Sequence, residues 1–333
     1  MEEIYNLDYY DYKVNKKLIA QEPLKERDKA RLMVIHRESG KIEHRIFRDI
    51  VDYLNKDDCL VLNNSKVIKA RIIGELNGQE VEIFYTRTIN ENEFEGIGKP
   101  LRKLKKGKTI KVKEYEILVK EELRGKRIFF LENFMNVFEK YGIIPLPHYI
   151  NRKPTKEDEV FYQTVYAKDE GSVAAPTAGL HFTKELIEQI QEKGVNVCYI
   201  TLHVGIGTFK PITEKDIRKH TMDKEFYEIP DETAKIIKTS KRIIAVGTTT
   251  TRALEYWNFD ENPTKGWTNL FIHPPYKFKV IHGLITNFHP PKSTPLILVS
   301  AFIGSFEKLK RAYEIAQEVE YRLFSYGDAM LIL

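Results

Sequence analysis

The spacing of hydrophobic residues divides the chain into stretches of two kinds. Before residue 67 and after residue 147, short apolar runs such as residues 32–36, 59–62 and 242–246 are bounded by turn residues. Such runs predict buried strands, and the longer segments between them predict helices at about 50–54, 231–240 and 296–304. Strands and helices mixed in this way predict an α/β (mixed α+β) main domain.

From residue 67 onward the pattern changes to short segments in which apolar and polar residues alternate. Glycines fall in the connections, and no long helical pattern interrupts the series. Closely spaced strands of this kind predict a small β-barrel. The predicted strands are residues 70–76, 80–86, 93–97, 109–112, 116–119 and 127–131. We therefore expect an inserted β-barrel domain at 67–147 and a main domain formed by residues 1–66 and 148–333.

Length and composition narrow the class of protein. A chain of 333 residues with 42% hydrophobic and 30% charged residues predicts a globular protein of two domains, or one domain with a large insert. No apolar run reaches the length that crosses a bilayer, and the acidic N-terminus lacks signal-peptide character, so we expect a cytoplasmic protein without a membrane partner. Cys59 and Cys198 could form a disulfide, but buried free thiols are the expectation in the cytoplasm.

Positive charge is concentrated in the predicted barrel. Between Lys99 and Arg127 there are twelve Lys or Arg residues and four Glu residues, whereas the net charge of the whole chain is +5. The rest of the chain is therefore slightly acidic, and the basic segment has the character of a surface that meets phosphates. A solvated charged face is the alternative interpretation.

Two segments rich in Gly, Ala and Thr carry histidines on either side of one predicted helix. They read GSVAAPTAGLHFT at residues 171–183 and TLHVGIGTF at residues 201–209. Small residues let a backbone approach a ligand closely, and Thr and His side chains offer hydrogen-bonding groups without fixed charge. A tight buried turn between packed layers is the alternative. The flanking histidines, His181 and His203, favour an active site. Thr183 can also cap the helix between the two segments.

A third segment has the character of an anion site. The predicted strand 242–246 runs into Gly247 and a row of four threonines, which Arg252 follows. A strand, a Gly-Thr turn and the start of a helix would present backbone N–H groups and hydroxyls to a negatively charged group. The segment lacks the Gly-Lys-Ser/Thr ending of a P-loop. A structural ion pair is the alternative role for Arg252.

Further segments of the same character read AVGTT at residues 245–249, TNFH at 286–289 and YGDAMLI at 326–332. Together with the two histidine segments, they closely resemble the S-adenosylmethionine:tRNA ribosyltransferase-isomerases of queuosine biosynthesis. The resemblance spans the whole chain, including AQEP at residues 20–23 and the inserted barrel. A thirteen-residue motif such as 171–183 is far more specific than an isolated glycine pattern.

The resemblance implies an enzyme that moves the ribosyl part of S-adenosylmethionine onto 7-aminomethyl-7-deazaguanine (preQ1) at the tRNA wobble position. The ribose is rearranged in the product, epoxyqueuosine-tRNA, and adenine and methionine are released. S-adenosylmethionine is then a co-substrate, and tRNA carrying preQ1 in the anticodon is the partner. No His-x-x-x-His or Cys-x-x-Cys spacing is present, so no metal is expected. We expect the protein to act as a monomer.

This chemistry needs a base for the hydrogens beside the sulfonium, a group that deprotonates the attacking amine, and an acid for the departing adenine. Histidine is well matched to these tasks near neutral pH, although a buried histidine that is merely hydrogen-bonded is the alternative in each case. The candidate catalytic residues are His181, His203, His289 and Asp328. The candidate substrate-binding residues are Thr177, Gly179, Gly205, Thr208, Thr248, Thr249, Arg252, Asn287, Lys292 and Ser293. The candidate tRNA-binding residues are Lys103, Lys105 and Lys106.

Two expectations leave alternatives open: the ligand of the Thr-rich turn and the class of protein. The Thr-rich turn with Arg252 would hold either the carboxylate of S-adenosylmethionine or a tRNA phosphate. A non-catalytic RNA-binding protein would use the basic barrel but leave the His and Thr cluster without a role. A methyltransferase would be expected to show a Gly-rich turn after its first strand and an acidic residue for the ribose, and neither is apparent. The reaction products distinguish a ribosyltransferase-isomerase from a methyltransferase and from a non-catalytic RNA-binding protein.

Overall fold

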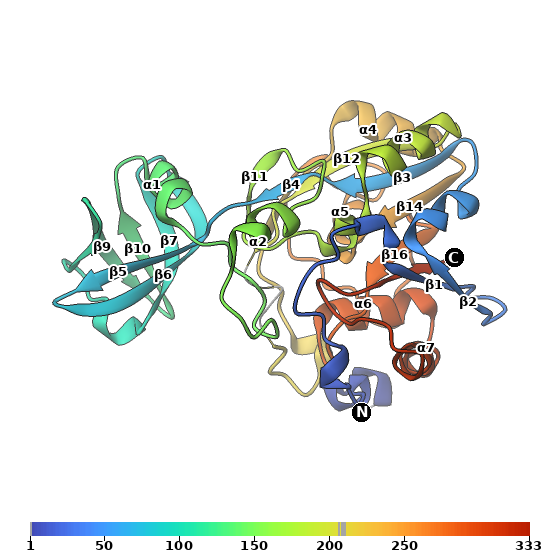
Figure 1. Cartoon of the computed structure of the whole chain (residues 1–333), viewed down its shortest axis with the longest axis horizontal. Helices are drawn as coiled ribbons and strands as arrows, with labels where there is room; N and C mark the ends of the chain where they lie inside the picture. Colours follow the sequence, from blue (N-terminus) through green and yellow to red (C-terminus); the bar gives the residue numbers. More distant parts are fainter. Residues whose placement is uncertain (1, 206, 208–210) are drawn as a thin grey trace.

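The computed structural model describes residues 2–205, 207 and 211–333, and it shows a main domain with a small barrel beside it (Figure 1). A nine-stranded mixed sheet crosses the main domain. From one edge to the other, its strands are β15 (Lys265–Thr268), β13 (Glu225–Glu228), β12 (Asn196–Leu202), β3 (Asp58–Asn63), β14 (Arg242–Val246), β16 (Gly283–Asn287), β17 (Ala329–Ile332), β1 (Arg31–Ile35) and β2 (Ile42–Ile46).

The centre of this sheet is parallel. Strand β3 pairs in parallel with β12 on one side and β14 on the other, and β14 pairs in parallel with β16. Every residue of β3 is buried, as expected for a strand covered on both faces. The carboxyl ends of β12, β3, β14 and β16 therefore meet at one edge of the sheet.

Helices cover both faces of the sheet. Successive side chains on a strand point to opposite faces, so each buried strand contributes to a core on either side. On β3, Leu60 and Leu62 pack into a core with α3, whereas Cys59 and Val61 pack into a second core with α4 to α7. The helices of the main domain are α2 (Lys156–Phe161), α3 (Lys184–Glu192), α4 (Asp231–Thr239), α5 (Thr248–Trp257), α6 (Thr294–Ile303) and α7 (Phe306–Glu318).

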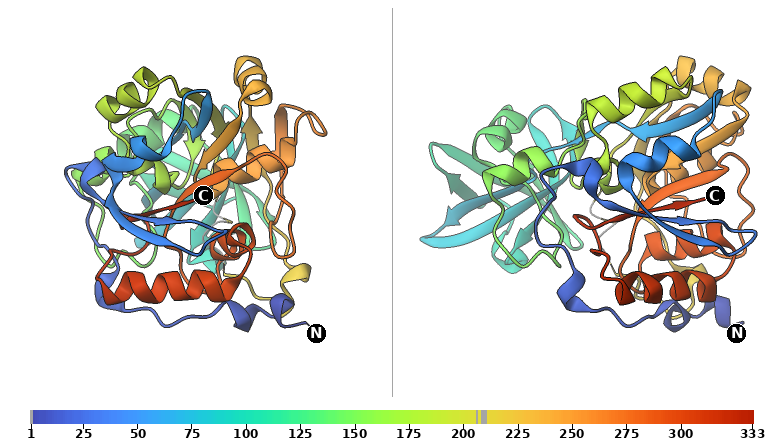
Figure 2. Two further views of the ribbon diagram at one scale, coloured as in Figure 1. Left: turned by 90° about the vertical axis from the view of Figure 1, so that its right-hand side faces the viewer. Right: turned by 45° about the vertical axis from the view of Figure 1, so that its right-hand side comes forward.

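The inserted barrel is closed and has six strands, as the alternating pattern predicted. It protrudes from one end of the main domain (Figures 1 and 2). Its core is closed by α1 (Phe134–Tyr141), which contributes Phe134, Val137 and Phe138. The strands are β5 (Arg71–Leu76), β6 (Gln79–Asn90), β7 (Glu93–Lys99), β8 (Thr109–Val112), β9 (Tyr115–Leu123) and β10 (Lys126–Phe130). The limits 67–147 for the whole insert stay a prediction.

Strands β4 (Ser65–Val67) and β11 (Asp169–Ser172) pair in parallel and form a two-stranded sheet of their own. The expected cap of α3 is confirmed, since Thr183 Oγ1 accepts a hydrogen bond from the Leu186 amide at 3.1 Å. The helix expected at 50–54 is instead a longer 3₁₀ helix, Phe47–Tyr53. Both cysteines are free and buried, as expected. Among the described residues, no helix is long and apolar enough to span a membrane.

Candidate active site

A cavity of about 500 Å³ lies where the carboxyl ends of β14 and β16 meet. Crevices outside the carboxyl ends of parallel strands are the usual ligand sites of α/β sheets. The start of α5 after β14 and the loop from β16 to α6 form two of its walls. Further lining comes from the segment 174–178, the pair Phe324–Ser325, Tyr149 and Tyr162. The volume falls in the range of small-molecule sites.

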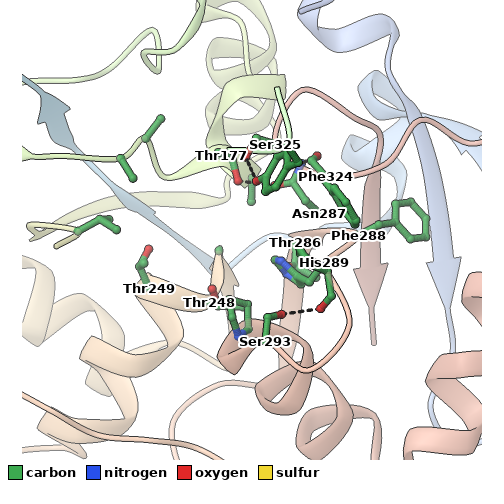
Figure 3. A pocket seen from close by; sticks show the side chains of 18 of the residues that line it. Thr177, Thr248, Thr249, Thr286, Asn287, Phe288, His289, Ser293, Phe324 and Ser325 are labelled. Carbon is green, nitrogen blue, oxygen red and sulfur yellow. Dashed lines mark hydrogen bonds between the residues drawn. The ribbon is translucent and has the colours of Figure 1, made fainter. Parts of the chain in front are cut away.

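The cavity gathers seven of the residues that the sequence singled out. They come from segments far apart in the chain, and Figure 3 shows the polar groups of these segments lying around the same space. The seven are Thr177, Thr248, Thr249, Asn287, His289, Lys292 and Ser293. Thr208 lies outside the described residues.

His289 is the one catalytic candidate that lines the cavity among the described residues. Its Nε2 is hydrogen-bonded to Oγ1 of Thr286 at 2.7 Å. Its backbone is held on both sides, because the Tyr313 hydroxyl accepts from its amide and the Tyr12 hydroxyl donates to its carbonyl. Desolvation of the partly buried ring lowers the pKa of His289 to about 3, so the imidazole is neutral at physiological pH. It can offer or accept a hydrogen bond there without carrying charge.

Thr177 and Asn287 join two walls of the cavity. Thr177 lies at the start of a 3₁₀ helix, Thr177–His181, and its hydroxyl donates to Oδ1 of Asn287 at 2.9 Å. Asn287 ends β16, and its amide donates to the Phe324 carbonyl at 3.3 Å. Ser325 is hydrogen-bonded to the Tyr149 hydroxyl at 2.6 Å. These bonds fix the polar groups in place before a ligand arrives.

The amino end of α5 faces the cavity without a side-chain cap. Gly247 precedes the helix with φ of 93°, a conformation that favours glycine, and it makes no side-chain cap hydrogen bond. The hydroxyls of Thr250 and Thr251 turn back to the carbonyls of Val246 and Gly247. Thr248 and Thr249 line the cavity. The first amides of a helix have no intrahelical partner, so this end can receive an anion.

Arg252 does not join that anion site. Its guanidinium forms a buried ion pair with Glu225 and donates from Nε to the Leu270 carbonyl at 2.9 Å. Arg252 and Glu225 are 6% and 3% exposed, so both charges are removed from solvent. The other oxygen of Glu225 accepts the amide of Gly205 at 2.8 Å. This geometry favours the structural ion pair over a direct contact with substrate.

His203 lies directly after β12 and beside the small sheet of β4 and β11. Its Nδ1 is 2.7 Å from Oγ of Ser65, and Ser65 is in turn 2.6 Å from Oγ of Ser172. Gly171 permits the close approach, because a Cβ there would lie 2.8 Å from the imidazole. Burial lowers the pKa of His203, and the nearby carboxylates of Asp169 and Glu228 oppose that effect. Its neighbour Val204 lines the large cavity.

His181 is buried away from the large cavity. Nδ1 is 3.1 Å from the Ala178 carbonyl, Nε2 is 2.8 Å from the Gly327 carbonyl, and the ring stacks on Phe47. Burial lowers the pKa of His181, although both carbonyls favour the protonated ring. Gly179 lies in the same 3₁₀ helix, where a Cβ would be 2.0 Å from the Tyr166 hydroxyl. These contacts are typical of packing.

Asp328 also lies outside the large cavity, and both of its carboxylate oxygens accept backbone amides. Oδ1 accepts from Arg31 at 2.9 Å and Oδ2 from Arg322 at 2.8 Å. Asp328 therefore ties the start of β1 to the segment that follows α7. Within the described chain, no group of three or more His, Cys, Asp or Glu side chains is placed to hold a metal ion.

The three candidate lysines follow β7 in the barrel. Lys105 and Lys106 are exposed and Lys103 is half-buried. Glu122 lies 3.4 Å from the Lys105 ammonium and also accepts the amide of Lys106. Lys103 donates to the side chain of Gln79. The segment is thus exposed to solvent, and its charge is partly offset.

Sequence reasoning missed several residues of the site. Thr286, Phe324, Ser325 and Tyr149 line the cavity and were not singled out. Thr286 lies in the TNFH motif, and Ser325 directly precedes the YGDAMLI motif, so both belong to or adjoin a recognisable segment. Ser65 lies two residues after the buried strand β3, which ends at Asn63. Its partner His203 is 138 residues away, so only the fold shows their contact.

Comparisons with known proteins agree with the resemblance. The chain is 51% identical to the S-adenosylmethionine:tRNA ribosyltransferase-isomerase of Sulfurihydrogenibium sp. (strain YO3AOP1), over 98% of this chain and 99% of that protein. A protein of the same name from Thermoanaerobacter sp. (strain X514) is 48% identical, over 97% and 98%. The crystal structure of a S-adenosylmethionine tRNA ribosyltransferase from Thermotoga maritima is 37% identical, has a TM-score of 0.56, and covers 97% of this chain and 99% of its own.

The match is not confined to single motifs. A family model described as queuosine biosynthesis protein extends over residues 7–332, which include both the main domain and the barrel. The family that the sequence motifs resembled is therefore confirmed along nearly the full length. The chain belongs to the queuosine biosynthesis protein family.

Proposed function

We propose that this protein transfers and isomerises the ribosyl moiety of S-adenosylmethionine onto preQ1 at the tRNA wobble position. The product is epoxyqueuosine-tRNA, and adenine and methionine are released. The observation that carries the proposal is the large cavity, which gathers the 171–183, 245–249 and 286–289 motifs around one space. Relatives named S-adenosylmethionine:tRNA ribosyltransferase-isomerase match 97–98% of the chain.

The cavity has the chemistry to hold S-adenosylmethionine. Its apolar lining, which includes Phe324, Pro176 and Val204, suits the adenine ring and the methylene groups of the methionine part. The uncapped start of α5 suits the carboxylate of the methionine part, because the helix dipole and free amides favour negative charge. Asn287 and Thr177 supply neutral hydrogen-bonding groups elsewhere on the lining (Figure 3).

Among the four catalytic candidates we favour His203 and His289, because His289 lines the cavity and His203 directly precedes Val204, which also lines it. His289, with its pKa of about 3, is a weak base, so it suits hydrogen bonding to a leaving group or a hydroxyl. His203 is only half-buried and adjoins the cavity through Val204. We assign proton acceptance from the attacking amine to His203, whereas His181 and Asp328 support the surrounding backbone. The protein acts as a monomer in the cytoplasm in this proposal.

Product analysis tests the proposal directly. The purified protein is incubated with S-adenosylmethionine and tRNA that carries preQ1, and nucleosides, adenine and methionine are quantified by mass spectrometry. We expect epoxyqueuosine in the tRNA with stoichiometric adenine and methionine. Formation of S-adenosylhomocysteine, or no consumption of S-adenosylmethionine under conditions where tRNA binds, would overturn the proposal. The same tRNA with guanine at the wobble position is the control.

A binding measurement locates the co-substrate. Replacing Asn287 by Ala removes a group that lines the cavity and the partner of Thr177, so S-adenosylmethionine should bind about tenfold more weakly in equilibrium dialysis. Asn136→Ala is the matched control, because Asn136 is exposed on α1 of the barrel. Equal affinities of the two variants would place the co-substrate elsewhere.

A further inference from the structure

Three aromatic rings form a row across the antiparallel strands β13 and β15 and the residue that directly follows β12. Phe226 on β13 is directly paired with Trp267 on β15, and the His203 amide donates to the Phe226 carbonyl at 3.0 Å. Side chains alternate along strands, so residues paired across strands share a face. The His203 and Phe226 rings stack with centroids 5.7 Å apart, and the Phe226 and Trp267 rings meet edge to face at 5.7 Å.

The row ends in an exposed indole. Trp267 is 49% exposed, whereas the other tryptophan of the chain, Trp257, is completely buried. Trp267 lines a second cavity of about 470 Å³ that lies between the main domain and the barrel. We refer to this second cavity as the cleft. A large aromatic side chain left open to solvent at a cavity is typical of a binding surface.

The barrel side of this cleft is basic. Arg87 and Lys126 line it, and both lie near the carboxylate of Glu95, at 3.5 and 2.6 Å. One carboxylate against two cations leaves an excess of positive charge on the barrel wall. The main-domain wall adds the exposed Lys224 beside Asp223.

Lys265, two residues before Trp267 on the same face of β15, places its ammonium 5.7 Å from the centre of the Phe226 ring. Aromatic platforms among cations are the recurrent design of single-stranded nucleic-acid sites. The cleft therefore combines an exposed aromatic platform with an excess of positive charge, the two features that such a site needs.

The cleft and the large cavity adjoin one another along the chain. Val204 lines the large cavity and Gly205 lines the cleft, so the two spaces meet at the segment that leaves β12. His203, which directly precedes this segment, is the end of the aromatic row. A nucleotide held in the cleft would therefore be a neighbour of one whose base reaches the large cavity.

We infer that the cleft binds an unstacked nucleotide of the anticodon loop, with its base stacked on Trp267 and its phosphate near Arg87 and Lys126. The inference rests on the proposed function for the identity of the RNA. Trp267 is a positioning residue: it holds the loop beside the modified nucleotide and makes no contact with the reacting atoms.

The two tryptophans make a direct test possible. In a Trp257→Phe protein, the remaining Trp267 is the sole source of tryptophan fluorescence. An anticodon stem-loop RNA with guanine at the wobble position should quench this fluorescence, with the same Kd as that measured from the anisotropy of the labelled RNA. Trp267→Ala should weaken binding about 10- to 100-fold, and Trp267→Phe should retain most of the affinity, since one stacked base is removed only in the first case. Phe259→Ala is the matched control, because Phe259 is similarly exposed but does not line the cleft.

The outcomes separate this inference from the proposed function. Tight binding of the stem-loop without quenching, together with wild-type affinity of Trp267→Ala, would overturn the inference while leaving the reaction untouched. Equal quenching by a fully base-paired RNA of the same length, or by an acidic protein in place of RNA, would also overturn it. If the stem-loop quenches Trp267 but preQ1-tRNA yields no adenine, the inference stands and the proposed function fails.

Discussion

The hydroxyl oxygen of Ser65 lies 2.7 Å from Nδ1 of His203. The bond joins the start of β4 to the residue after β12, and Ser172 extends it, since its Oγ accepts the Val204 amide at 2.8 Å. This chain of hydroxyls fixes the orientation of the imidazole. The orientation of a histidine decides which of its nitrogens can serve in proton transfer.

Replacing His203 by Ala should lower kcat by about 10²–10⁴, the usual effect of losing a proton-transfer group. Ser65→Ala leaves the ring in place but frees it to rotate, so we expect kcat to fall about tenfold, with a shifted pH profile. The rate of adenine release at saturating substrate concentrations gives kcat for both variants. His36→Ala, on the distant hairpin of β1 and β2, is the control. Wild-type turnover of His203→Ala would remove this residue from the mechanism.

His181→Ala should act on stability. The substitution removes a stacked ring and the hydrogen bond that the neutral imidazole donates to one of its two neighbouring carbonyls, which together stabilise by about 2–4 kcal/mol. Urea unfolding at neutral pH measures the change, and S-adenosylmethionine affinity of the folded variant should stay close to wild type. An unchanged unfolding free energy combined with abolished turnover would instead support a catalytic role for His181.

Acid should destabilise the protein through His289. The folded-state pKa of about 3 lies below the ordinary histidine value of 6.5, so the unfolded chain binds one more proton between these values. Stability from this group is therefore complete above pH 6.5 and falls by about 1.4 kcal/mol per pH unit as pH decreases towards 3. Urea unfolding at a series of pH values below neutrality should show a slope that is smaller by one proton in His289→Asn. Identical slopes for variant and wild type would contradict a neutral His289 in the folded protein.

Arg252→Ala should destabilise the fold by about 3–5 kcal/mol, because it removes the guanidinium that is paired with the buried carboxylate of Glu225. The double variant Arg252→Met, Glu225→Gln should recover part of this stability, since both charges of the ion pair are removed and Gln can still accept the Gly205 amide. Chemical denaturation of the wild type, the Arg252→Ala variant and the double variant measures how much stability is lost and how much is recovered. A stable Arg252→Ala protein that binds S-adenosylmethionine or tRNA weakly would return Arg252 to the anion site.

Replacing Lys103, Lys105 and Lys106 together by Ala should raise the KM for tRNA and flatten its salt dependence. Each phosphate that is no longer neutralised should lower the slope of log affinity against log salt by roughly one. Saturating kcat should barely change, because uniform binding is what the substitutions remove. The triple variant Lys13, Lys16 and Lys17 to Ala, in the N-terminal segment of the main domain, controls for net charge. A collapse of kcat with the salt slope intact would contradict a role in phosphate binding.

Much of the architecture could be predicted from the sequence because it depends on local patterns. Alternation of apolar and polar residues predicted the six barrel strands, and the buried runs predicted β1, β3 and β14. Thr183 was recognisable as a cap, since capping needs only a hydroxyl three residues before a helical amide. The motifs likewise identified the family, because they are contiguous stretches of chain.

The tertiary structure alone decided what each motif residue contacts. His181 and His289 occur in equally distinctive segments, yet one ring is enclosed by two carbonyls and the other lines the cavity. Arg252 follows a Thr-rich turn that suits an anion, but the strand pairing of β13 brings Glu225 to it first.

No local sequence pattern distinguishes Trp267. It comes to lie beside Phe226 and His203 only because β12, β13 and β15 pair with one another. Sequence patterns report burial and backbone preference, which are properties of neighbouring residues. Contacts between residues more than a hundred positions apart, such as Ser65 with His203, depend on how the sheet is ordered, and no local pattern records that.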